Sequence, residues 1–193
     1  MKRILLVLLL CSQTVSAQLA TYQGEFNAIN KDLMLGLGSY AVSNFVLSGI
    51  GYATAEDETT KRFHEMNVMW NTVNFGLAVP GYLKAVRDDR SLTLEQMIKA
   101  QKTTETVFLV NDVLDVAYIA TGVWMRQNAG NHPDRESQLK GYGNSLILQG
   151  AFLLAFDAYA YHVHHNHGKS LPALDKVSFG TSGAGVGLVI ALD

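Results

Sequence analysis

The sequence predicts an all-α protein, a four-helix bundle that spans a membrane and ends in a short extended tail or hairpin. Only 17% of its 193 residues are charged, whereas about a quarter are charged in ordinary soluble domains. Residues 33–55 and 66–83 contain no charged side chain. A secreted soluble four-helix bundle remains the alternative, because Asp112, Asp115 and Asp157 interrupt the later apolar stretches. Each carboxylate costs about 2.5–3.5 kcal/mol at the centre of a membrane helix unless it faces partners.

Residues 1–17 have the pattern of a secretory signal peptide. Lys2 and Arg3 precede an apolar segment over 4–10, and Val15-Ser16-Ala17 forms a small-residue cleavage site. Cleavage there would remove Cys11, the single cysteine, and would exclude disulfides, thiol nucleophiles and cysteine metal sites from the mature chain. After a cleaved signal, four membrane crossings place both mature ends outside the cytoplasm. The loop lysines and arginines are balanced, so this orientation depends on the signal alone.

The first two helices are predicted between 18 and 83. An amphipathic helix over 18–32 continues without a breaker into 33–55, which is long enough to cross about 30 Å of hydrocarbon. Residues 56–62 form a charged connection. The second span covers 63–83, and Pro80-Gly81 is expected to end or kink it.

The third and fourth helices follow a charged loop over 84–90. Thr93 and Gln96 form a capping box, so a helix starts near Leu94 and its later part, 106–125, is the third span. A polar loop over 126–140 leads to the fourth span, 141–161, and the helical domain covers 18–167. In the tail, 168–193, alternating apolar residues predict a hairpin that turns at 181–183.

Polar side chains recur inside the predicted spans at helical spacing, so those on one helix share a face. The favoured interpretation is hydrogen bonding between helices that holds the bundle together. The alternative is a polar cavity in which Asp115 and Asp157 bind a proton or cation. The candidate set is His64, Asn67, Asn71, Asn74, Asn111, Asp115, Tyr118, Gln149 and Asp157.

A histidine cluster near the end of the fourth helix is the candidate for metal binding: His162, His164, His165 and His167. Its other interpretation is a solvated helix end, where imidazoles suit the negative end of the helix dipole. Because no catalytic or metal-binding motif accompanies these residues, we expect no cofactor. A metal-dependent enzyme is only an alternative. No basic patch with interleaved aromatic residues occurs, so we expect no nucleic-acid partner.

Three polar motifs in order carry a resemblance: Asn67-x-x-Trp70-Asn71-x-x-Asn74, Asn111-x-x-x-Asp115-x-x-Tyr118, and Gln149-Gly150-x-x-Leu153-x-x-x-Asp157. Over residues 25–165 the chain resembles a family of uncharacterised Gram-negative bacterial proteins, a domain of unknown function with a signal peptide and several hydrophobic helices. The resemblance implies a membrane protein of the bacterial cell envelope and transfers no activity. We therefore expect an inner-membrane protein with both termini periplasmic and the lipid bilayer as its partner. A soluble periplasmic protein is the alternative, and a protein partner or homo-oligomer is left open.

Overall fold

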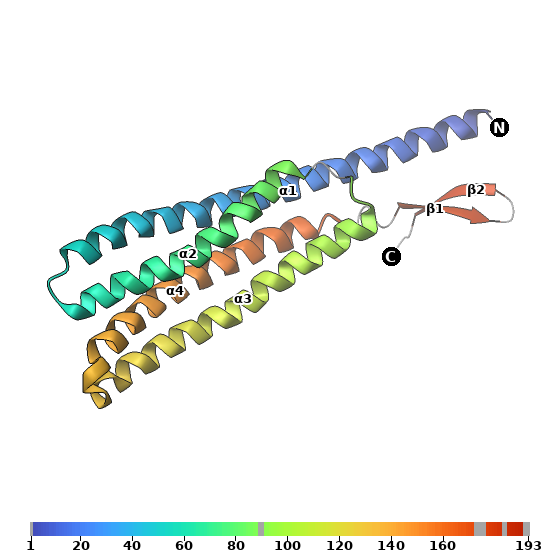
Figure 1. The fold of residues 1–193 in the computed structure, drawn as a ribbon. Coiled ribbons are helices and arrows are strands. Elements are labelled where there is room, and N and C mark those ends of the chain that lie inside the picture. The colour runs from blue at the N-terminus through green and yellow to red at the C-terminus, as the bar shows by residue number, and fades with distance from the viewer. Residues whose placement is uncertain (1, 89–90, 172–176, 183–184, 191–193) are drawn as a thin grey trace.

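Four long helices make up most of the computed structural model, which describes residues 2–88, 91–171, 177–182 and 185–190. They are α1 (Lys2–Thr54), α2 (Glu58–Arg87), α3 (Leu94–Asn128) and α4 (Glu136–Gly168), with the short 3₁₀ turns η1 (Ala129–Asn131) and η2 (Pro133–Arg135) between α3 and α4. Figure 1 shows the helices running alternately in opposite directions along one bundle. The predicted all-α fold of four helices is confirmed.

The helices pack as two pairs that are joined through α4. α1 packs along α2, α3 packs along α4, and α4 also packs against α2. α2 and α3 approach each other much less closely. The seams of α3 with α1 and with α2 are therefore packed less closely than the seam between α3 and α4.

Helix α2 begins and ends outside the predicted limits. Its first residue is Glu58, because the Asp57 side chain accepts a hydrogen bond from the Thr60 backbone N–H at 2.9 Å and caps the helix. The hydrogen bond from the Thr60 hydroxyl lowers the pKa of the Asp57 carboxyl. The predicted charged connection over 56–62 is therefore too long. In contrast, the capping box of Thr93 and Gln96 is confirmed at the start of α3.

Of the two effects predicted for Pro80-Gly81, an end of the helix is wrong, because α2 continues to Arg87. Proline removes one backbone hydrogen bond from a helix interior. Packing on both sides of it offsets this loss: Ala78 is buried against Leu37 of α1, and Met34 lies directly over Gly81. Part of the predicted loop over 84–90 is consequently helical.

The bundle exposes large apolar side chains and buries polar ones, the reverse of a water-soluble domain. Val113, Leu47 and Leu77 are 70%, 67% and 62% exposed. Over the described residues three helical segments are long and apolar enough to cross a membrane, Ala17–Thr54, Leu94–Asn131 and Pro133–Gly168. α2 is not among them, although four spans were predicted, because its asparagines lower its mean hydropathy.

Glycines allow α3 and α4 to approach closely. A Cβ atom placed on Gly122 would lie 2.6 Å from the carbonyl oxygen of Gly143, and a Cβ on Gly143 would lie 2.6 Å from that of Gly122. A Cβ on Gly150 would lie 3.0 Å from the carbonyl oxygen of Asp115. Small residues permit such close packing of membrane helices, and here they bring the polar side chains of α3 and α4 together.

After α4, the strands β1 (Val177–Ser182) and β2 (Gly185–Ile190) pair antiparallel, from Val177 with Ile190 to Ser182 with Gly185. The predicted turn at 181–183 includes Gly183, which lies outside the described residues.

Candidate functional site

One buried network is centred on Asn67 of α2. Its Oδ1 atom accepts hydrogen bonds from the Ser145 hydroxyl at 2.7 Å and from Gln149 Nε2 at 2.8 Å, both on α4. All three side chains are buried. The network therefore joins α2 to α4 in the middle of the bundle.

Helix α1 completes this network. The Tyr40 hydroxyl donates to Gln149 Oε1 at 3.1 Å, and Asn44 Oδ1 accepts from Gln149 Nε2 at 3.5 Å. On α2 itself, Asn71 Nδ2 donates to the Asn67 backbone carbonyl, and Asn74 Nδ2 donates to Asn71 Oδ1 at 3.2 Å. Each of these amides has a partner, as buried polar groups require.

The predicted candidate set does not include three residues of this network, Ser145, Tyr40 and Asn44. Ser145 lies four residues before Gln149, and Tyr40 lies four residues before Asn44. This spacing puts each pair on one helix face and could have drawn attention to these residues.

A second polar group lies between α3 and α4. Asp115 and Asp157 are only 2% and 5% exposed, and their carboxyl groups lie close enough to interact electrostatically. Asn111 lies one turn before Asp115 on α3, and its side chain interacts with Asp157. Asp115 Oδ2 is fully buried and has no hydrogen-bond partner within the described part of the chain. This group differs from the Asn67 network because one carboxyl oxygen, Asp115 Oδ2, has no hydrogen-bond partner among the described residues.

A cavity of about 130 Å³ adjoins the carboxyl pair, and all four helices contribute to its wall. In its wall, Trp70 of α2 and Tyr118 of α3 pack edge to face against each other, with ring centroids 4.7 Å apart. Leu77 and Leu114, on its rim, are substantially exposed, so the cavity borders the outer surface between α2 and α3. Five of the nine predicted candidates line it: Asn74, Asn111, Asp115, Tyr118 and Asp157.

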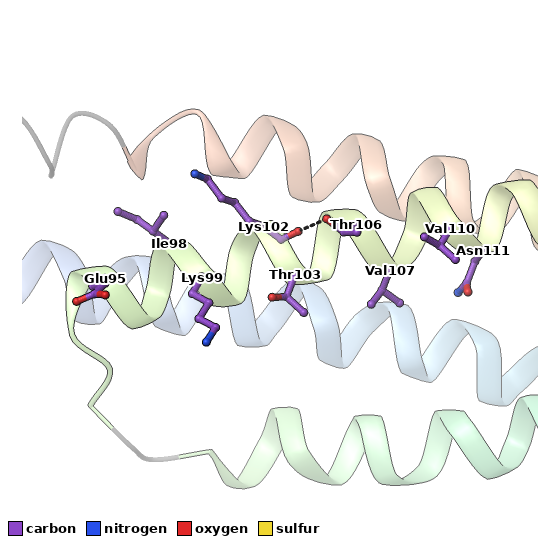
Figure 2. Close-up of a pocket in the computed structure, with 9 residues that line it drawn as sticks. All are labelled: Glu95, Ile98, Lys99, Lys102, Thr103, Thr106, Val107, Val110 and Asn111. Atoms are coloured by element: carbon purple, nitrogen blue, oxygen red, sulfur yellow. Dashed lines mark hydrogen bonds between the residues drawn. The ribbon is translucent and has the colours of Figure 1, made fainter.

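Asn111 also lies at one end of a surface groove of about 640 Å³ along α3. In Figure 2, Lys99, Thr103, Val107 and Asn111 project from the same side of α3. The groove begins at Glu95, near the start of the helix. Asn111 therefore belongs both to the cavity wall and to the surface groove along α3.

His64 belongs to neither polar group. Its ring lies against Gly51 of α1, where a Cβ atom would overlap it, and its Nδ1 atom is buried without a partner in the described structure. Asp112 likewise does not line the cavity, although its Oδ1 atom is buried and unpaired within the same described range.

The structure does not bring the four histidines of α4 into one site. His164 is buried between Phe26 and Phe108, whereas His167 stacks on Tyr22 with ring centroids 4.0 Å apart. His165 lies 3.5 Å from Glu105, His167 lies 3.2 Å from Glu25, and His162 pairs with Asn166. Within the described residues, no three His, Cys, Asp or Glu side chains are grouped so that they could hold a metal ion.

Comparison with known proteins gives one match. The profile of a family described as "Family of unknown function (DUF6992)" matches residues 36–158. No curated protein and no solved structure matches the chain. The matched range includes the Asn67 network and the carboxyl pair.

Proposed function

Because the chain belongs to DUF6992, a family of unknown function, we propose its function from geometry: it is a membrane-embedded bundle that binds a proton or small cation at Asp115 and Asp157. The observation that carries this proposal is the unpaired Asp115 oxygen, buried beside a second carboxyl group and a cavity.

The reversed distribution of side chains supports the membrane part of the proposal. Large apolar side chains are exposed on all four helices. Their exposure has no free-energy cost when the surrounding solvent is hydrocarbon. Trp70 lies about 18 Å from the first residue of α2 at about 1.5 Å per residue, so the cavity would sit near the bilayer midplane. The start of α1 and the end of α4 lie at the same end of the bundle in Figure 1. With a signal cleaved after Ala17, both mature ends would be periplasmic in a Gram-negative inner membrane.

Helix α2 would enter the membrane with its neighbours. It packs along α1 and α4, and its buried asparagines hydrogen-bond to α4 or to each other. Its low mean hydropathy thus comes from side chains that lipid would not contact.

The two polar groups support different roles. The Asn67 network is internally paired, and hydrogen bonds of this kind hold membrane helices together. A structural role is therefore the second candidate function and belongs to this network. The carboxyl pair has a polar atom without a partner, and ionisable groups inside a membrane are functional candidates by default.

Electrostatics explain why the pair would take up a cation. Two adjacent carboxylates in an apolar surrounding repel each other, and each loses its hydration. One proton or one cation between them removes most of this cost. A ligand that binds only the folded protein at 100 times its Kd stabilises it by about 2.7 kcal/mol.

Thermal unfolding of the detergent-purified protein tests the proposal. The melting temperature of the wild type should depend on pH or on added cation, and Asp115→Asn should abolish that dependence while the protein stays folded. Asp157→Asn should behave in the same way, whereas Asp134→Asn, an exposed loop position, should match the wild type. An Asp115→Asn protein that keeps the full pH and cation response would contradict the proposal.

A further inference from the structure

We propose that the cation bound at this site is a small organic ammonium ion, held between the carboxyl pair and the aromatic rings that share its cavity. This inference rests on the proposed function and goes beyond it, because a proton or a metal ion would not need the rings.

Aromatic side chains form a large part of the cavity wall. Trp70, Tyr118 and Phe156 line it from three different helices. The face of an aromatic ring carries partial negative charge and attracts cations, with tryptophan the strongest. Cages of such rings recognise quaternary ammonium groups. The cavity therefore combines formal negative charge with a surface suited to methylated nitrogen.

The size of the cavity limits the ligand. Its volume of about 130 Å³ is close to that of a roughly 150 Å³ protein cavity that binds benzene. Drug-sized ligands need pockets of about 300–1,000 Å³. A compact ion such as tetramethylammonium has a suitable size, and the apolar wall of Leu37 and Leu153 suits its methyl groups.

The donor set does not favour a hard metal ion. Calcium takes six to eight oxygen ligands, as general coordination chemistry requires. Here two carboxyl groups are the charged donors on the cavity wall, and no third His, Cys, Asp or Glu side chain within the described residues joins them in a group that could hold a metal ion. An organic ammonium ion needs fewer oxygen contacts, because its charge is spread and its surface is apolar.

Charge compensation is the argument that this inference shares with the proposed function. Asp115 is 2% exposed, and its Oδ2 atom has no partner in the described structure, beside a cavity that Asp115 itself lines. A cation in the cavity would pair with this oxygen.

The fluorescence of Trp70 can report binding directly. The chain has two tryptophans, and Trp124 is 60% exposed and away from the cavity, so Trp124→Phe leaves Trp70 as the single reporter. This full-length protein in detergent is titrated with tetramethylammonium chloride and, at equal ionic strength, with potassium chloride. Tetramethylammonium should change the Trp70 emission with saturation, and potassium should not.

Variants on the same background separate the contributions. Tyr118→Leu should weaken tetramethylammonium binding about tenfold, the loss expected for one desolvated cation–π contact, and Tyr118→Phe should recover most of it. Tyr159→Leu, at an exposed position on α4, is the control and should not alter the affinity. Asp115→Asn should abolish the response.

The failures of the two proposals are distinguishable. If potassium or sodium changes the emission as tetramethylammonium does, or if only pH does so and Asp115→Asn removes the effect, the ammonium inference is overturned and cation or proton binding stands. If tetramethylammonium binds equally well to Tyr118→Leu and Tyr118→Phe, the rings do not select it. If no cation and no pH change alters Trp70 in an Asp115-dependent way, both proposals fail.

Discussion

Asn67 is the residue on which the paired network depends, because its one side-chain oxygen accepts two hydrogen bonds from α4. Its backbone carbonyl accepts a third, from Asn71. The donors, Ser145 and Gln149, are buried and have no access to water. A single side chain of α2 therefore satisfies two buried donors of α4.

Replacing Asn67 should destabilise the bundle. Asn67→Leu would leave the Ser145 hydroxyl without an acceptor and weaken the position of Gln149, and an unsatisfied buried polar group costs roughly 1–3 kcal/mol. We expect a clearly lower melting temperature by circular dichroism in detergent. Asn131→Leu, at an exposed position, is the control. Equal melting temperatures for the two variants would show that the network does not hold the helices together.

At the scale of elements, the seam between α3 and α4 depends on glycine. Gly122 and Gly143 face each other so closely that neither position can hold a Cβ atom without movement of the backbone. The same seam contains Asp115 and Asp157 further along the helices. Close packing of α3 and α4 at Gly122 and Gly143 thus sets the separation of the Asp115 and Asp157 carboxyl groups.

Two glycine-to-alanine substitutions should have opposite effects on the free energy of unfolding. Gly143→Ala overfills the seam and should cost about 1–3 kcal/mol. Gly49→Ala, on α1 with nothing within 4 Å of the added Cβ, should instead stabilise the helix by about 0.5–1 kcal/mol. Chemical denaturation of each variant measures the change, and a neutral Gly143→Ala would mean that the helices are more loosely packed than described.

On the scale of the whole molecule, the exposed apolar side chains of the helices are the feature that distinguishes a membrane protein from a secreted soluble bundle. Val113 and Asn131 are both exposed in the isolated chain, one in the middle of α3 and one in η1 at the end of the bundle. Lipid would cover the first and leave the second in water.

Cysteine labelling in native membranes tests this difference. On a Cys11→Ser background, a water-soluble maleimide should react readily with Asn131→Cys and slowly with Val113→Cys. Solubilisation in urea should make both react, which controls for protein content. Fast labelling of both cysteines in intact membranes would favour a soluble or peripheral bundle.

Sequence periodicity was sufficient for features that depend on neighbours along one helix. The spacing of Asn67, Asn71 and Asn74 put them on one face, and all three are buried. The Thr93–Gln96 capping box involves only four residues, so it too could be predicted. The end of α2 could not, because packing on α1 and α4 outweighs the local effect of Pro80.

By itself, the sequence determined that the chain is helical and which polar side chains share a helix face, since both follow from spacing within a helix. Only the tertiary structure decided how these faces meet. It separated the predicted polar interior into a hydrogen-bonded amide network and a pair of carboxyl groups, of which Asp115 Oδ2 has no partner among the described residues. It also brought Trp70 of α2 against Tyr118 of α3. The physical reason is that the contacts between helices depend on where their backbones can approach. Along the seam between α3 and α4, glycines on both helices set this approach, and no pattern within either helix specifies it.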